Sequence, residues 1–205
     1  VEVVEHAVHM TADGKKLWVI HGDYFDSLKK LKQDKERQKL ILFLGSNIGN
    51  LTVEQATRFL SHLSENLNPG DGMLVGFDLK KDPRIILSAY DDAAGVTEAF
   101  NKNLLRRINN ELGANFDLNA FGHHPFYNPE TGTTKSYLVS TKQQDVYLKK
   151  IGKTISFYPW ESIHTEISQK FDHKTIEQMA KDANLEIKEA YTDSKRYYSN
   201  YLFNV

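Results

Sequence analysis

Short apolar runs and one amphipathic helix dominate the first part of the chain. Residues 40–44 (LILFL) are all apolar and precede a turn signal, a pattern typical of a strand buried on both faces of a parallel sheet. Thr52 and Gln55 predict the start of a helix, and apolar residues at helical spacing continue to position 67. Residues 73–79 (MLVGFDL) predict the next strand. This order of strand, helix and strand predicts a βαβ unit with parallel strands.

The rest of the chain alternates between helices and short strands. We expect a long helix over residues 91–112, opened by the carboxylates of Asp91 and Asp92, and a loop-rich segment over residues 113–129. Further strands are expected at residues 16–20, 136–140, 145–148, 154–157, 185–192 and 197–205, and a helix at residues 174–183 that begins after Asp172. We therefore expect an α/β fold with its core at residues 1–88 and 170–205, and an inserted α+β lobe at residues 89–169.

Composition and charge exclude several classes of protein. The 205 residues carry 26 basic and 27 acidic side chains, and this balance argues against a nucleic-acid partner. No stretch approaches the ~20 apolar residues that span a bilayer, so we expect no membrane partner and a cytoplasmic location. The absence of cysteine excludes disulfides, a thiol nucleophile and cysteine-ligated metal sites. The His123–His124 pair has no carboxylate at metal-ligand spacing, so no metal is expected.

Polar and small residues follow the predicted strands, where open α/β sheets bind ligands. Residues 45–50 (GSNIGN) contain two glycines, which either let the backbone approach a ligand or only permit a tight turn. They form neither a phosphate-binding P-loop nor a dinucleotide fingerprint. Asp23 follows another strand and is a candidate for binding the amino group of an adenine, or for a helix N-cap. Glu166 and Ser168 share one face of a predicted strand, either as a recognition pair or as surface residues beside Ile167.

Five segments together are similar to one enzyme family. They are residues 44–50 (LGSNIGN), 76–82 (GFDLKKD), 89–105 (AYDDAAGVTEAFNKNLL), 107–121 (RINNELGANFDLNAF) and 165–171 (TEISQKF). The chain resembles the histidine-specific, S-adenosylmethionine (SAM)-dependent methyltransferases, which include the Nα-methyltransferases of ergothioneine biosynthesis. The resemblance implies a Rossmann-like methyltransferase core, a substrate-binding lobe, SAM as cofactor and methyl transfer to the α-amino group of an amino acid.

The resemblance also implies roles for individual residues. For the cofactor, Asp23 and Tyr24 match the pair that contacts adenine, and Gly45 matches a position near the methyl donor. For the substrate, the matching positions are Asn50 and Tyr90 at the α-amino and α-carboxylate groups, Asn47 and Phe100 along the pocket, Glu166 and Ser168 at the imidazole, and Ser136 in the pocket. No residue is assigned as the general base.

The chain departs from the family pattern in two places. The glycine-rich first strand of the family has no clear match before residue 16, so we expect a core that lacks its N-terminal part. Ser136 stands where family members often carry methionine. The expected substrate is L-histidine; the alternatives are another amino acid or amine, such as a tryptophan derivative, or a fragment without catalytic activity. We expect a monomer.

Overall fold

The structure of the protein is a computed structural model that describes residues 4–10, 16–21, 24–33, 35 and 38–205. The chain divides into two compact units. The first contains residues 1–48, 52–77 and 172–205, and the second contains residues 49–51 and 78–171. The division into a methyltransferase core and a substrate-binding lobe, at residues 88 and 169, stays a prediction.

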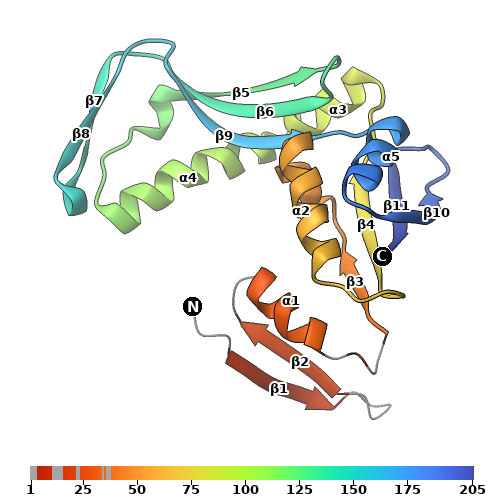
Figure 1. Cartoon of the computed structure of the whole chain (residues 1–205). Helices are drawn as coiled ribbons and strands as arrows, with labels where there is room; N and C mark the ends of the chain where they lie inside the picture. The colour runs from red at the N-terminus through yellow and green to blue at the C-terminus, as the bar shows by residue number, and fades with distance from the viewer. Residues whose placement is uncertain (1–3, 11–15, 22–23, 34, 36–37) are drawn as a thin grey trace. The chain divides into compact units, whose positions relative to one another are not determined.

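The first unit is an α/β structure built around a four-stranded sheet (Figure 1). Its elements are β1 (Val4–Met10), β2 (Lys16–His21), α1 (Tyr24–Gln33), β3 (Leu40–Phe43), α2 (Val53–Glu65), β4 (Gly72–Asp78), α5 (His173–Asp182), β10 (Glu186–Thr192) and β11 (Tyr198–Asn204). The sheet has the order β10-β11-β4-β3, and β1 and β2 form a separate antiparallel pair. Because β3 and β4 are parallel and α2 connects them, the predicted βαβ unit is confirmed.

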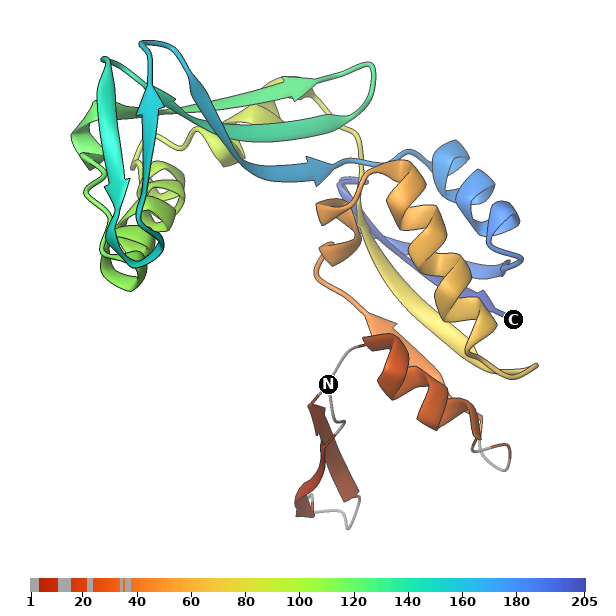
Figure 2. The ribbon, with the colours of Figure 1, turned by 60° about the vertical axis from the view of Figure 1, so that its left-hand side comes forward.

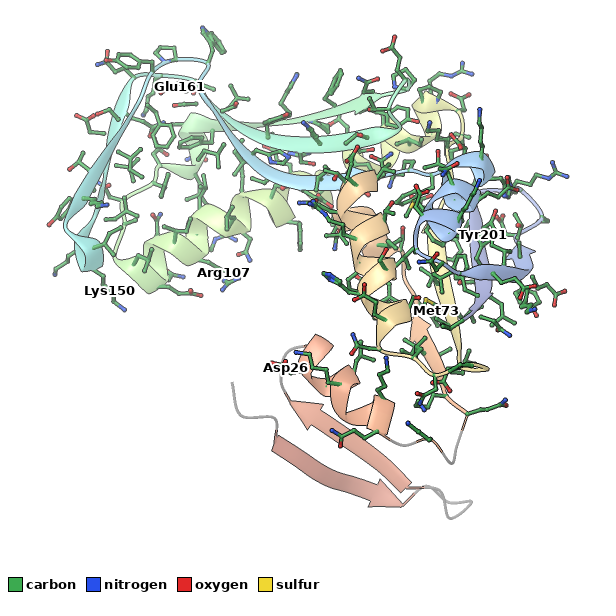
Figure 3. All side chains as sticks on the ribbon, in the orientation of Figure 1. Asp26, Met73, Arg107, Lys150, Glu161 and Tyr201 are labelled. Carbon is green, nitrogen blue, oxygen red and sulfur yellow. The ribbon has the colours of Figure 1, made fainter. Side chains whose placement is uncertain are left out.

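One face of this sheet is covered by α2 and α5, which lie side by side in Figure 2. Thr52 caps α2 as predicted. Its side chain accepts a hydrogen bond from the backbone N–H of Gln55, and the side chain of Gln55 accepts one from the backbone N–H of Thr52. Met73 on β4 and Tyr201 on β11, both labelled in Figure 3, are 0% and 3% exposed. Burial of such apolar surface is the main source of stability in this unit.

The predicted burial of β3 on both faces is wrong. Residues 40–44 were expected to be buried on both faces, but Leu40 and Leu42 are 58% and 59% exposed. Phe43 points the other way and lies 4.8 Å, between ring centroids, from Phe59 of α2. Within the described part of the chain, helices therefore cover only one face of the apolar run. An apolar composition alone does not show whether one or both faces of a strand are covered.

The second unit combines two helices with antiparallel strands (Figure 1). Its elements are α3 (Pro83–Tyr90), α4 (Val96–Leu112), β5 (Phe121–Asn128), β6 (Thr133–Ser140), β7 (Gln144–Leu148), β8 (Lys153–Phe157) and β9 (Ser162–Gln169). A three-stranded sheet has the order β5-β6-β9, and β7 and β8 form a hairpin. Its core gathers Leu105 of α4 with Phe121, Leu138 and Phe157. The predicted antiparallel strands of this region are confirmed.

Two elements of this unit differ from the predictions. The helix expected over residues 91–112 begins at Val96, and a separate helix, α3, precedes it. Asp82 caps α3 and Pro83 occupies its first turn, a start signal that the apolar pattern did not reveal. The segment expected as a loop contains β5, which includes Pro125; a proline is tolerated there because β5 is an edge strand. No helix among the described residues is long and apolar enough to cross a membrane.

Candidate active site

Two adjoining hollows of the second unit share the side chains of Phe100 and Glu166. The first, of about 420 Å³, is also lined by Asp78, Ala89, Tyr90, Val96 and Thr97. The second, of about 410 Å³, is also lined by Asn50, Asn101, Thr165 and Ile167. Four of the predicted substrate residues, Asn50, Tyr90, Phe100 and Glu166, therefore line these hollows, and their size suits a small molecule.

A β-bulge sets the direction of Glu166. Ser136 of β6 pairs with Glu166, but the next residue of β6 pairs with His164, so Thr165 is the extra residue of the bulge. The Thr165 hydroxyl lies 2.6 Å from Oδ1 of Asn101, to which it donates, and 3.0 Å from the carbonyl oxygen of Ser136. These contacts join β9 to β6 and to α4 at the point where Glu166 enters both hollows.

Buried hydroxyls stand beside Glu166 and Ser168. Ser136 and Thr134 lie directly opposite these two residues in the β6–β9 pairing, so all four side chains share one face of the sheet. Ser136 is 0% exposed and Thr134 is 1% exposed. Neither hydroxyl has a hydrogen-bond partner among the described residues. An unpaired buried hydroxyl is costly, so this face offers polar groups to a ligand or to water.

Tyr90 lies at the carboxyl end of α3, where its backbone and side chain are both held. It ends a helix, α3, that the sequence pattern did not predict. Nε2 of His123 lies 2.8 Å from the Tyr90 carbonyl oxygen. Just beyond, the Asp92 carboxylate accepts from the backbone N–H groups of Val96 and Thr97, and its hydrogen bonds with Thr97 and Val96 lower the pKa of Asp92 to about 2.

A buried lysine that no sequence pattern revealed connects Tyr90 to Ser168. Lys170 is 3% exposed. Its Nζ donates to the Tyr90 hydroxyl at 2.8 Å and to Oγ of Ser168 at 2.8 Å, and it pairs with Oδ2 of Asp78 at 2.7 Å. Burial alone would lower the pKa of Lys170, but the hydrogen bonds to Asp78 and Tyr90 raise it, so the side chain is an ammonium. The only signal in the sequence was its place in the segment TEISQKF.

The predicted cofactor residues fall on the first unit. Gly45 and Ser46 have left-handed φ angles of 75° and 58°, which end β3 in a sharp turn. The backbone N–H of Ser46 donates to the Tyr198 hydroxyl at 3.2 Å, and Nδ2 of Asn47 donates to the Leu44 carbonyl oxygen at 2.9 Å. Apart from the adjoining residues, the nearest heavy atom to a Cβ added at Gly45 would be Nδ2 of Asn47 at 3.9 Å, so the turn leaves room beside its backbone.

The two residues predicted to contact adenine lie where the structure describes no side chain. Asp23 lies outside the described residues. Tyr24 begins α1, but its side chain also lies outside them. Asn47 and Gly45 belong to the first unit, whereas Asn50, Tyr90, Phe100, Ser136, Glu166 and Ser168 belong to the second. Within the described ranges there is no group of three or more residues that could hold a metal ion.

Comparison with known proteins decides the family. A sequence model of the family described as histidine-specific, SAM-dependent methyltransferases matches residues 5–205. The chain belongs to this family. The histidine N-alpha-methyltransferase of Mycolicibacterium smegmatis shares 38% identity with it over 180 residues, covering 88% of this chain and 56% of that enzyme.

Two further proteins show a weaker similarity to this chain. Ergothioneine biosynthesis protein 1 of Schizosaccharomyces pombe is 28% identical over 176 residues, which cover 85% of this chain and 22% of that protein. The CcbJ methyltransferase from Streptomyces caelestis is 14% identical with a TM-score of 0.41, over 88% of this chain and 75% of that one. The chain spans about half the length of the bacterial relatives it matches.

Proposed function

We propose that this methyltransferase family member binds L-histidine in the two hollows and directs methyl transfer from SAM to its α-amino group. The observation that carries the proposal is the shared position of Glu166. This carboxylate lines both hollows, together with Tyr90 on one side and Asn50 on the other. Ser168 follows on the same face of β9, so an imidazole bound there would meet a carboxylate and a hydroxyl together.

The donor and acceptor groups suit the two ends of histidine. A carboxylate only accepts, so Glu166 takes the ring N–H, while Ser168 addresses the second ring nitrogen. Tyr90 and Asn50 offer a hydroxyl and an amide to the α-carboxylate and α-amino groups, and Phe100, 73% exposed, offers an aromatic face. Holding both ends of the substrate fixes the direction of the α-amine, and such orientation is worth ~7–11 kcal/mol in favourable cases.

The turn at Gly45, together with Asp23 and Tyr24, is the part of the chain that we propose holds SAM. When bound, SAM supplies an electrophilic methyl group on its sulfonium. The residues described above bind the substrate and orient its amine. The amine must be unprotonated to react, and we assign no side chain of this chain as the base.

Ser136 supports a second candidate substrate. A serine at 0% exposure fills less space than the methionine that family members often carry there, and its hydroxyl has no partner in the described chain. A larger ring, such as the indole of tryptophan, would fit beside this smaller side chain once the groups that now cover Ser136 give way. Glu166 argues against this candidate, because an indole has a single N–H and offers Ser168 no ring nitrogen.

Calorimetric titration with L-histidine and L-tryptophan tests the choice. Glu166→Ala should weaken histidine binding by about 10- to 100-fold, the range for a hydrogen bond to a charged group. Tryptophan binding should weaken far less. Glu130→Ala is the matched control, because Glu130 lies exposed in the turn between β5 and β6. An unchanged ratio of the two affinities in Glu166→Ala would remove Glu166 from the recognition site.

The cytoplasmic location and the monomeric state stay predictions, which fractionation and size-exclusion chromatography test.

A further inference from the structure

The ammonium group of Lys170 uses all three of its hydrogens. Its partners are the carboxylate of Asp78, the hydroxyl of Tyr90 and the hydroxyl of Ser168, at 2.7, 2.8 and 2.8 Å. An ammonium has no lone pair, so it cannot accept a hydrogen bond from either hydroxyl. Both hydroxyl oxygens must therefore accept from Lys170, and each hydroxyl hydrogen must point elsewhere.

Neither hydrogen has a destination inside the described part of the protein. The Tyr90 and Ser168 hydroxyls accept from Lys170, and no donation by either to another protein group is found among those residues. Tyr90 lines the first hollow, and Ser168 lies on the face of β9 that carries Glu166. Each hydroxyl is therefore free to donate to a bound molecule, and Lys170 imposes this direction on both.

Lys170 is held in place both at its ammonium group and along its main chain. Asp78 also pairs with Nζ of Lys81 at 2.5 Å, so its carboxylate is held by two ammonium groups. The backbone N–H of Lys170 donates to the Gly132 carbonyl oxygen at 2.7 Å. A Cβ at Gly132, whose φ is 75°, would lie 2.5 Å from the Lys170 carbonyl oxygen, so glycine permits this close approach.

We propose that Lys170 is a positioning residue that fixes the Tyr90 and Ser168 hydroxyls as hydrogen-bond donors to the substrate. The inference rests on the proposed function and adds a statement about the form of the substrate. Ser168, fixed as a donor, requires a ring nitrogen with a free lone pair, while Glu166 requires a ring N–H. A neutral imidazole has one of each, whereas an imidazolium has two N–H groups and an indole has no lone-pair nitrogen. Tyr90, fixed as a donor, suits a carboxylate oxygen.

A double-mutant cycle on L-histidine affinity tests this positioning role. Lys170→Met is measured in the parent chain and in a Tyr90→Phe/Ser168→Ala background, where both hydroxyls are absent. We expect Lys170→Met to weaken histidine binding about tenfold or more in the parent and less than about twofold in the background. A purely structural lysine would cause the same loss in both. Circular dichroism checks that each variant is folded, and Lys170→Gln replaces Lys170→Met in the cycle if the methionine variant does not fold.

The outcomes separate this inference from the proposed function. Failure of the parent to bind millimolar L-histidine, by calorimetry or ligand-observed NMR, would overturn the proposed function and the positioning role with it. Binding by the parent with equal losses in the two backgrounds, or with no loss in the parent, would overturn only the role of Lys170. A loss confined to the parent background supports it.

Discussion

Replacing Thr165 by valine removes one hydroxyl and nearly keeps the shape of the side chain. That hydroxyl lies 2.6 Å from Oδ1 of Asn101 and 3.0 Å from the carbonyl oxygen of Ser136. Asn101 is only 4% exposed, so its amide oxygen would lose its partner without gaining water. A buried polar group left unpaired costs about 1–3 kcal/mol, and we expect Thr165→Val to lose stability within this range.

The same substitution should also affect the site. Thr165 is the extra residue of the bulge that directs Glu166 into the hollows, and its hydroxyl ties that bulge to α4. A bulge without this tie has more freedom, so histidine affinity should fall several-fold, about 1 kcal/mol, in addition to the loss of stability.

Thr165→Ser is the matched control, because it keeps the hydroxyl and removes only a methyl group. Urea denaturation followed by circular dichroism gives the stability of each variant, and calorimetric titration gives its histidine affinity. If Thr165→Val equals Thr165→Ser in both measurements, the hydroxyl does not hold the bulge and our explanation for the direction of Glu166 is wrong.

Two further predictions concern the supports of the sheet and of α4. Gly76→Ala should destabilise the first unit by about 1–3 kcal/mol in thermal or urea denaturation, because a Cβ at Gly76 would overlap the Tyr198 hydroxyl. Gly122→Ala should be nearly neutral, because a Cβ at Gly122 would meet no heavy atom within 4 Å. Hydrogen bonds from Thr97 lower the pKa of Asp92 to about 2 in the folded state, against about 3.9 when unfolded. The contribution of this carboxylate to stability is therefore complete above pH ~4 and disappears as the pH falls towards 2. Acid denaturation of Asp92→Asn should lack this part of the pH dependence, and an unchanged profile would show that the carboxylate does not support α4.

Much of the fold was predictable because local signals and tertiary packing agree. The capping pair Thr52 and Gln55, the apolar strand before them and the strand after them all indicate the same βαβ unit, which the structure contains. The predictions failed where a local signal was ambiguous. Residues 113–129 suggested a loop-rich segment, but they contain β5, an edge strand that can hold Pro125. The all-apolar residues 40–44 suggested two covered faces, but packing covers one.

The candidate site was predictable only in part. The sequence placed Glu166 and Ser168 on one face of a strand, and β9 confirms that arrangement. It could not reveal Lys170, since a lysine is normally exposed and this one is buried through partners at Asp78 and Tyr90, 92 and 80 positions earlier in the chain. The bulge at Thr165 also depends on a distant residue of α4, so no local pattern shows it.

The function that we propose centres on methyl transfer from SAM to the α-nitrogen of histidine. Its most direct test is to incubate the protein with L-histidine and SAM labelled with carbon-13 in the methyl group, and to locate the label by two-dimensional NMR. The account predicts a labelled methyl group on the α-nitrogen and none on the imidazole ring, with L-tryptophan at equal concentration left unlabelled. Label on a ring nitrogen, label on tryptophan in preference to histidine, or no labelled amino acid would contradict it.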